Sequence, residues 1–315
     1  MINEIKLNAF RQSVKKPKGR YKIKVFDKNN RLKKETGFCN LVCDQGLDSY
    51  NNFGGLLFNS CFLGTNNSVP VISDTKGTMN IVQTLNKHTP EAQPVFDPVL
   101  KKWTLAREYW LSSGSLAVGE QLTEIGVGYI NDLFSRTLIK DQNGLPMILT
   151  LSADDYLYIY YEVEFFPPAD TDIIGVIDFS GQIYDYVLRP CEIESVSWAP
   201  VAVQKITGCF ASIDQNLSNS ISSPQRNQAA TSVVYTPYLD GSFEQEALFT
   251  FSPNVANYEN GIAVFVFTSY DLGISEHWQV KFTKQGDDDP VFFKNLPKTN
   301  EMTLKLRFKN LWSVV

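Results

Sequence analysis

The sequence predicts an all-β fold of two β-sandwich-like units with at most a short helix near residues 44–50. First, strand-length segments with period-two alternation of apolar and polar residues recur along the chain, as in residues 21–27. Second, aromatic residues make up 13% of the chain, and most are Tyr or Phe, which favour strands. Third, no sustained helical periodicity or heptad repeat is present. These observations together favour packed sheets.

Several strands and one helix are expected in the first half of the chain. Residues 21–27 alternate between two faces, turn at residues 29–30 and can return through residues 32–36 as a hairpin. Residues 44–50 are the best candidate for a helix, because Asp44 can cap it and two apolar side chains share its inner face. Further strands are expected at residues 56–63, 101–111, 122–129, 134–140, 147–151 and 156–166.

Two adjacent prolines mark the expected domain boundary. Pro167 and Pro168 cannot donate to a strand ladder, so they divide the chain into an N-terminal β-rich domain, residues 1–166, and a C-terminal β-sandwich-like domain, residues 167–315. Residues 212–231 are rich in Ser, Asn and Gln and predict a long polar loop that orders on docking. Strands of this second domain are expected at residues 173–179, 184–188, 196–203, 233–239, 247–251, 262–270, 278–282, 291–293 and 303–311.

Charge and hydropathy argue against a nucleic-acid binder and a membrane protein. The formal charge is -5 and the isoelectric point is near 5.2, whereas proteins that bind duplex nucleic acid usually carry a basic surplus. The basic run at residues 15–24 is interpreted as a solvated loop and strand edge. Residues 1–6 lack the apolar core of a signal peptide, and the longest apolar stretches, such as residues 262–267, are too short to span a bilayer. A soluble protein is expected.

The cysteines indicate a reduced protein made in a cytosol. Their number is odd, so they cannot all pair within one chain, and the first two have CxxxC spacing rather than CxxC. The chain has only two histidines, which makes a Cys/His zinc site improbable. Buried free thiols and no metal or cofactor are therefore expected. The cysteines are Cys39, Cys43, Cys61, Cys191 and Cys209, and the histidines are His88 and His277.

Few residues suggest catalytic chemistry. No GxSxG, HExxH, P-loop or GxGxxG motif stands out. His277 beside Glu276 could form a dyad, but a surface or packed histidine near a turn is the favoured interpretation. The acidic pair at residues 154–155 and the acidic triplet at residues 287–289 could bind calcium. However, they lack EF-hand spacing and are better explained as solvated turn acids. The sequence predicts a non-enzymatic protein with no catalytic, cofactor-binding or metal-binding residues.

Aromatic residues raise the question of whether the protein binds a sugar. An exposed aromatic ring can stack on a sugar, whereas aromatics at alternating strand positions are mostly expected in a core or a subunit interface. Sugar binding is therefore the minority interpretation. The candidates are Trp103, Tyr109, Trp110, Trp198 and Trp278.

An ordered series of motifs runs through the first half of the chain. Residues 38–48, FCNLVCDQGLD, contain an F-x-N-L step followed by G-L-D. LGTN at residues 63–66 and LTEIGVG at residues 122–128 come next. FSRTLIKDQNGLPM at residues 134–147 and DDYLYIYYE at residues 154–162 complete the series. In this order the motifs resemble a family of tailed-bacteriophage virion proteins, usually described as tail, tail-fibre or structural proteins.

The resemblance covers residues 21–166, which is about half of the chain. Pro70 and the element at residues 73–75 continue its pattern. Asn66 departs from it, because a second glycine is usual at that position, and residues 76–100 follow no pattern of the family. The second half of the chain carries no signature of the family.

The resemblance implies a structural component of the virion, made in the cytoplasm of the bacterial host and placed in the tail, the baseplate or a fibre adaptor. Its partners would be neighbouring virion proteins and copies of itself, and the cyclic symmetry of phage tails suggests a trimer or hexamer. The alternatives are a receptor-binding or carbohydrate-binding fibre protein, which would contact a host surface glycan, and a head or neck decoration protein. An enzyme is the weakest alternative.

Some motif residues have a physical interpretation of their own. Gly46 and Gly64 suit positive φ at tight turns. Glu124 and Arg136 lie on strands that should be close together, so a buried pair between them would be a structural clamp rather than a catalytic device. Residues 141–144, DQNG, predict a hairpin turn.

Overall fold

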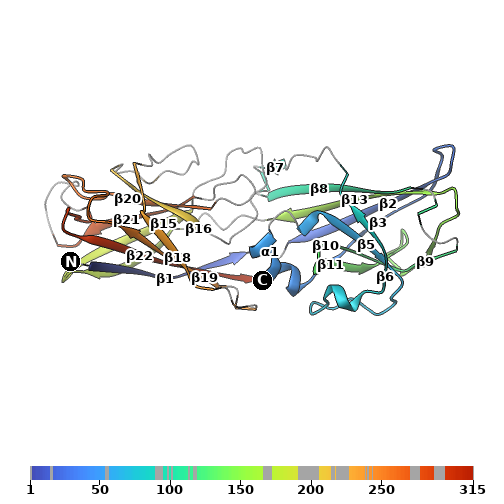
Figure 1. Ribbon diagram of the computed structural model, residues 1–315, viewed down its shortest axis with the longest axis horizontal. Coiled ribbons are helices and arrows are strands. Elements are labelled where there is room, and N and C mark those ends of the chain that lie inside the picture. Colours follow the sequence, from blue (N-terminus) through green and yellow to red (C-terminus); the bar gives the residue numbers. More distant parts are fainter. Residues whose placement is uncertain are drawn as a thin grey trace. The chain divides into compact units, whose positions relative to one another are not determined.

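The protein is described here by a computed structural model (Figure 1). Contacts divide the chain into two compact units. The terminal unit consists of Met1–Val14, Pro167–Val196 and Ala202–Val315, and the inserted unit consists of Lys15–Phe166 and Ser197–Val201. The structure describes residues 2–14, 17–53, 57–88, 95–97, 99–100, 102–112, 114–115, 119–165, 172–190, 206–213, 217, 227–237, 239, 241–242, 244–269, 277–286 and 295–314.

The predicted all-β class is confirmed. Within the described residues the strands form five sheets, and the one α-helix is α1 (Asp44–Phe53). The helix begins at the residue predicted from the sequence and extends three residues past Tyr50. The strand expected at residues 56–63 is shorter than predicted, because β5 starts at Ser60.

Two five-stranded sheets make up most of the inserted unit. The first has the order β3-β2-β13-β8-β7, and the second has the order β4-β11-β10-β5-β6. A short pair, β12-β9, completes the unit. The bounds are β2 (Lys18–Phe26), β3 (Leu32–Cys39), β4 (Leu41–Val42), β5 (Ser60–Gly64), β6 (Ile81–Asn86), β7 (Val95–Asp97), β8 (Lys102–Leu111), β9 (Gln121–Leu122), β10 (Glu124–Tyr129), β11 (Asp132–Leu138), β12 (Leu149–Thr150) and β13 (Tyr156–Phe165), with a 3-10 turn, η2, at Lys76–Thr78.

The core of the inserted unit lies between these two sheets. Alternation along β2 and β13 directs every second side chain inward, so that Tyr21 and Tyr161 are fully buried with ring centroids 4.7 Å apart. Tyr21 Oη is 3.1 Å from Ser135 Oγ on β11, which joins the first sheet to the second. Phe58 meets Phe134 edge to face at 4.8 Å. The unit is therefore a sandwich of two sheets around an aromatic core.

The terminal unit also contains two sheets, of order β1-β22-β19-β18 and β14-β15-β21-β20-β16-β17. Strand β1 pairs in parallel with β22, from Ile2 opposite Thr303 to Val14 opposite Val314, and the other pairings of the unit are antiparallel. The bounds are β1 (Ile2–Val14), β14 (Ile173–Phe179), β15 (Gln182–Pro190), β16 (Ile206–Ser212), β17 (Gln228–Ala229), β18 (Ser232–Tyr235), β19 (Glu244–Phe251), β20 (Val264–Ser269), β21 (His277–Lys284) and β22 (Thr303–Val314).

Phenylalanines dominate the core of the terminal unit. Phe249 on β19 lies 5.7 Å from Phe267 on β20, and Phe267 lies 4.4 Å from Phe308 on β22. Phe251 and Phe265 make a similar pair at 5.6 Å. All five side chains are at most 1% exposed. Because these rings come from strands of both sheets, the two sheets pack face to face.

The observed division of the chain differs from the boundary at residue 166 by one strand. Pairing with β22 places β1 in the terminal unit, whereas the sequence-based division assigned residues 1–14 to the N-terminal domain. The first and last described strands thus lie side by side, and the inserted unit interrupts the chain between β1 and β14.

The outcome for the other local predictions is mixed. The hairpin turn at residues 141–144 is confirmed, because Asp141 Oδ1 accepts the N–H groups of Asn143 and Leu145 at 2.9 Å and Gly144 has a φ of 79°. The described part of the segment 212–231 includes the short strand β17, so it is not a continuous loop. The strands expected at residues 196–203 and 291–293 lie outside the described residues.

The turn interpretation of Gly46 and Gly64 is wrong. Neither glycine has a positive φ; Gly46 lies in α1 and Gly64 in β5. Both are required by close approach instead. A Cβ on Gly46 would lie 2.3 Å from Cα of Phe134, and one on Gly64 would lie 2.4 Å from Oε1 of Glu124.

Candidate functional site

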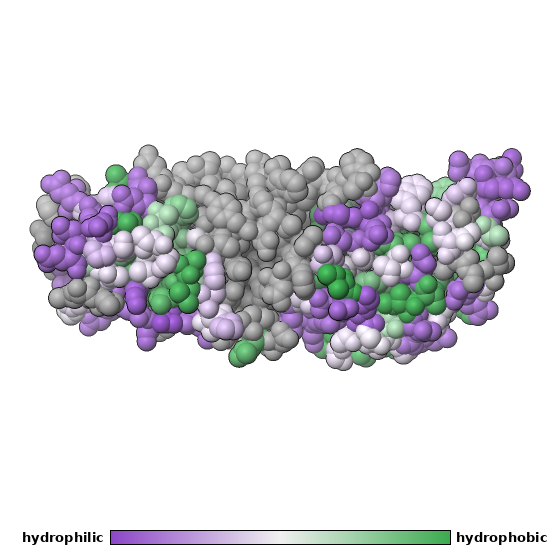
Figure 2. Space-filling model, in the orientation of Figure 1, coloured by the Kyte–Doolittle hydropathy of each residue, from purple (hydrophilic) through white to green (hydrophobic). Residues whose placement is uncertain are grey.

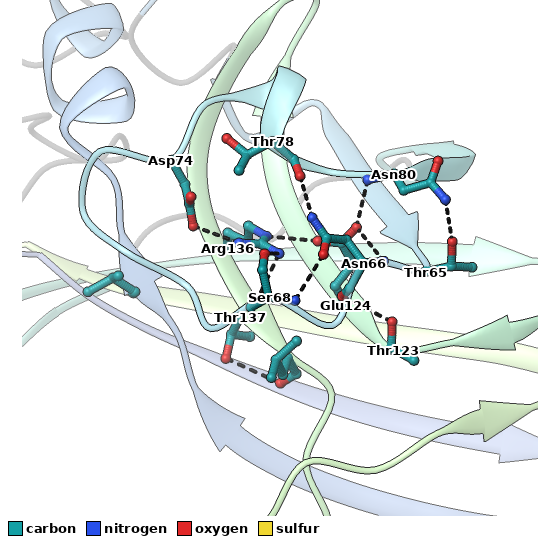
Figure 3. A network of polar contacts seen from close by, with 12 residues as sticks. Thr65, Asn66, Ser68, Asp74, Thr78, Asn80, Thr123, Glu124, Arg136 and Thr137 are labelled. Carbon is teal, nitrogen blue, oxygen red and sulfur yellow. Dashed lines mark hydrogen bonds and ion pairs between the residues drawn. The ribbon is translucent and has the colours of Figure 1, made fainter.

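Arg136 is the centre of a polar cluster inside the inserted unit (Figure 3). Its Nε donates to Oε2 of Glu124 at 2.7 Å, and its Nη1 donates to Oδ2 of Asp74 at 2.7 Å. Its Nη2 donates to the carbonyl and hydroxyl oxygens of Ser68 at 3.2 and 2.9 Å. Arg136 and Glu124 have no exposed surface and Asp74 is 3% exposed, whereas Ser68 reaches the surface. We call these four residues the arginine cluster.

The arginine cluster fixes the loop between β5 and β6. The second carboxylate oxygen of Glu124, Oε1, accepts the backbone N–H groups of Asn66 and Asn80 at 3.1 and 2.9 Å. The side-chain amide of Asn66 donates to the carbonyl of Thr78 at 2.7 Å, so the two ends of the loop are tied to each other as well (Figure 3). Residues 65–80 are consequently held by a charged group on a neighbouring strand rather than by a ladder of their own.

Asn66, where the motif series led us to expect a glycine, makes contacts through both its side chain and its backbone. Its Oδ1 accepts the N–H of Ser68 at 2.9 Å, which closes an Asx turn. Its carbonyl accepts the hydroxyl of Thr123 at 3.1 Å. A glycine could accept the hydrogen bond of Thr123 through its carbonyl, but it could not form the Asx turn, which requires the side chain of Asn66.

The strand register explains the glycines of the motifs. Strand β10 lies between β5 and β11, with Glu124 opposite Gly64 and Gly126 opposite Arg136. A Cβ on Gly126 would lie 2.8 Å from Sδ of Met79 and 2.9 Å from the carbonyl of Ser135. Both glycines leave the space that the cluster and the loop occupy.

The electrostatics of the arginine cluster favour structure over chemistry. Burial would lower the pKa of Arg136, but its hydrogen bonds to Asp74 and Glu124 outweigh burial and hold that pKa above its ordinary value. The guanidinium stays charged, its fork is filled by three partners, and its surroundings exclude a substrate. The predicted clamp between Glu124 and Arg136 is confirmed, and Asp74 and Ser68 are partners that the sequence-based reasoning missed.

The acidic turn at residues 154–155 contains two different carboxylates. Asp154 is exposed, as expected for a solvated turn acid. Asp155 is 5% exposed, which corrects that expectation; Lys33 Nζ lies 2.8 Å from both of its oxygens, and its Oδ2 accepts the N–H of Ser152 at 2.9 Å. Burial raises the pKa of Asp155, but the bonds from Lys33 and Ser152 outweigh it and lower the pKa below its ordinary value. The acids at residues 287–289 lie outside the described residues.

The four described cysteines are thiols that do not take part in disulfides. Cys43, Cys61 and Cys209 are buried, and burial raises the pKa of the Cys61 and Cys209 thiols. Cys39 is exposed, so the expectation of burial is wrong for this residue. Cys191 lies outside the described residues.

The structure does not test the dyad of His277 and Glu276, which was the disfavoured interpretation. His88 is exposed, whereas Glu276 and the side chain of His277 are outside the described residues. Among the residues that the structure does describe, no group of three or more His, Cys, Asp or Glu side chains could hold a metal ion.

Only one of the described sugar-stacking candidates reaches solvent. Trp110 is 49% exposed, whereas Tyr109 is fully buried and Trp278 is 4% exposed. Trp198 and the side chain of Trp103 lie outside the described residues.

A polar cavity in the terminal unit was not foreseen from the sequence. Its volume is about 430 Å³, and Lys298 lies in its wall. The Lys298 ammonium is buried and donates to the carbonyl of Ser252 at 2.9 Å, to Oδ1 of Asn257 at 2.8 Å and to the carbonyl of Pro253 at 3.4 Å. Burial lowers the pKa of Lys298. Its donors are directed at the loop between β19 and β20, so the lysine holds that loop in place.

Comparison with protein-family models, curated proteins and solved structures finds no match to this chain. In the part of the chain described by the structure, no helix has the length and apolar character needed to cross a membrane.

Proposed function

We propose that this chain is a non-enzymatic structural component of a tailed-bacteriophage particle, located in the tail, the baseplate or a fibre adaptor, where it assembles with itself and with neighbouring virion proteins. The observation that supports this most is the arginine cluster. The motif residues that resemble virion proteins, Glu124 and Arg136 among them, are used to build a buried ion cluster that fixes a loop. These motif residues stabilise the fold, and the charged groups of the arginine cluster are buried and already paired. Such a role for the motifs suits an assembly protein.

The fixed loop presents apolar side chains to solvent. Val69 is 76% exposed, and Val71 and Ile72 are each 50% exposed. Asp74 Oδ2, which binds Arg136, also accepts the N–H of Val71 at 2.9 Å, so the cluster holds this stretch of backbone directly. An apolar loop that is already ordered loses little conformational entropy on docking, which favours a protein contact.

The terminal unit has an apolar surface of its own. On β14 the side chains of Ile174 and Val176 are 76% and 58% exposed, and Ile183 on the neighbouring β15 is 37% exposed. On the face drawn in Figure 2, apolar residues lie among hydrophilic ones in both units. Exposed β-branched side chains on an outermost strand favour association with another protein or a second copy.

Self-assembly is tested by the mass of the purified chain in solution. Light scattering over a concentration series is expected to give a trimer or a hexamer. Ile174→Lys is expected to lower the mass, because it puts a charge in the apolar surface, while Leu145→Lys on the exposed hairpin turn serves as the control. A strict monomer at all concentrations would contradict autonomous self-assembly.

The rival functions make different predictions. A receptor-binding fibre protein and a head or neck decoration protein would differ from a tail component in their location on the particle. An enzyme would turn over host glycans, and a single Asp or Glu substitution would abolish that turnover. We expect no turnover of glycans by the purified chain.

A further inference from the structure

Five side chains form a continuous aromatic and acidic surface on the outer face of the first sheet of the inserted unit. Along β8 the buried side chains of Tyr109 and Leu111 alternate with Glu108 and Trp110, which therefore project outward. Along β13, Tyr158, Tyr160 and Glu162 project to the same side. The two strands are neighbours, with Trp110 opposite Tyr158 and Glu108 opposite Tyr160. We call Glu108, Trp110, Tyr158, Tyr160 and Glu162 the Trp110 face.

Hydrogen bonds hold the rings of this face in place. Tyr158 Oη donates to Oε1 of Glu108 at 2.8 Å, and Tyr160 Oη donates to Oε2 of Glu162 at 3.2 Å. The Trp110 and Tyr158 rings meet edge to face, with centroids 4.8 Å apart and planes at 65°. These contacts fix the aromatic side chains before any ligand arrives.

Each carboxylate of the face keeps one oxygen for a ligand. Oε2 of Glu108 and Oε1 of Glu162 receive no hydrogen bond within the described part of the chain. Trp110 supplies a half-exposed ring on the same strand as Glu108, whereas Glu162 lies further along the face, opposite Ala106. A ligand that fits must therefore bring hydrogen-bond donors for the acids and a flat C–H surface for the indole.

The surroundings of the face restrict the ligand further. Strand β13 is paired along its length with β2 on one side and β8 on the other, so its backbone cannot accept an added strand, whereas within the described residues β7 pairs only with Lys102–Thr104 of β8. Charges of both signs lie on and beside the face. Lys24 on β2 lies opposite Tyr158 and is positive, whereas the carboxylates of Glu108 and Glu162 are negative. Neither a strongly anionic nor a strongly cationic ligand is favoured by such a surface.

We propose that the Trp110 face binds a neutral oligosaccharide, with one sugar ring stacked on Trp110 whose hydroxyl group donates to Glu108, and with a further sugar whose hydroxyl group donates to Glu162. A saccharide combines a flat C–H face, which is attracted to the electron-rich indole, with adjacent hydroxyl donors on its edge. A protein contact centred on Trp110 would instead require a surrounding rim that excludes water from a buried pocket, whereas Trp110 is half exposed and its ring neighbours are Tyr158 and His88. This proposal assigns the sugar binding that the sequence left open to one face of the molecule, and it does not depend on the proposed function.

The test uses the full purified chain and an array of neutral oligosaccharides, followed by titration calorimetry with the glycan that binds best. Trp110→Ala is expected to weaken binding roughly tenfold or more, the size expected for loss of a stacking contact together with its buried area. Glu108→Gln is expected to weaken it less, because the amide keeps one acceptor. Leu145→Ala removes another exposed apolar side chain of the inserted unit and is expected to change nothing.

The fold of each variant is checked by thermal unfolding, and Trp110 is exposed enough for its truncation to leave the core intact. Failure of every neutral glycan to bind at millimolar concentration would overturn the proposal. Binding that Trp110→Ala leaves unchanged would overturn it equally. If Trp110→Ala altered the solution mass and no glycan bound, the face would be a protein interface and the saccharide proposal would be wrong.

Discussion

The two units hold a buried cation in different ways. In the inserted unit, Arg136 contacts the two carboxylates of Glu124 and Asp74, and both of these acids also accept backbone N–H groups. In the terminal unit, the hydrogen bonds of Lys298 go only to neutral oxygens, two carbonyls and the amide of Asn257. The first arrangement couples three charges across two strands and a loop, whereas the second places one ammonium against one loop.

The two units therefore depend on buried charge to different degrees. Removal of one member from a coupled ion cluster leaves the others buried without compensation, which is costly. Removal of an ammonium that faces neutral acceptors leaves only unsatisfied oxygens, and it also removes the cost of burying the charge. The inserted unit should therefore be far more sensitive to a single charge deletion than the terminal unit.

The largest effect is expected for Arg136→Ala. The variant leaves Glu124 and Asp74 buried without their cation, so the free energy of unfolding should fall by about 3–5 kcal/mol. Denaturant unfolding measures the loss, and hydrogen exchange should show loss of protection at the amides of Asn66 and Asn80.

Arg136→Lys is the matched variant for that prediction. It keeps the charge but cannot span Glu124 and Asp74 with a planar fork, so it should lose less stability than Arg136→Ala and more than a surface substitution. A loss below about 1 kcal/mol for Arg136→Ala would contradict the coupled cluster.

A smaller effect is expected for Lys298→Met. The methionine fills much of the same volume and leaves the acceptors of Ser252 and Asn257 without their donor, so the loss should be about 1–3 kcal/mol. A loss as large as that of Arg136→Ala would remove the distinction between the two units.

The effect of Lys298 on stability should depend on pH, which gives a second way to compare the two buried cations. Its pKa is lower in the folded chain than its ordinary value of 10.5, so the unfolded chain binds more protons between these two values. The stability of the wild-type chain relative to Lys298→Met should therefore rise with pH through this window. Denaturant unfolding of both chains in alkaline buffers measures this difference, and a relative stability that fell through the window would contradict it.

The smallest effect is expected for Asp155→Asn, which tests a pair at the surface of the inserted unit. Lys33 is partly exposed and its ion pair is screened by water, so the loss in unfolding free energy at neutral pH should be about 1 kcal/mol.

The pKa of Asp155 in the folded chain is lower than its ordinary value of 3.8. The stability that Asp155 contributes is therefore present above pH 3.8 and disappears as the pH falls through the folded pKa. The wild-type chain and the variant should therefore converge in acid; a constant difference in unfolding free energy would contradict this assignment.

Local patterns in the sequence predicted many of the strands and the pair between Glu124 and Arg136, but they did not predict β1, β6 or β16. The alternation of residues 21–27 predicted β2, and the strands that carry Glu124 and Arg136 were expected to lie close together, as the structure shows for β10 and β11. The class of the fold followed from such segments, because each pattern depends on neighbours along the chain.

Contacts between distant segments could not be predicted in this way. Asp74 lies 62 residues before Arg136, and the acceptors of Lys298 are mainly backbone carbonyls, which any residue type could provide. The pairing of β1 with β22 joins the two ends of the chain, which no local pattern indicates. Alternation separated Trp110 from its buried neighbours, but only the observed packing of the two sheets shows which face of β8 is covered.

The most direct test of the proposed function is immunoelectron microscopy of tailed particles released by bacteria that express this gene, with antibodies raised against the purified chain. We expect labelling at one fixed place on each particle, at the tail, the baseplate or a fibre attachment point. Particles that carry no label, together with a chain found only in the soluble lysate, would contradict it.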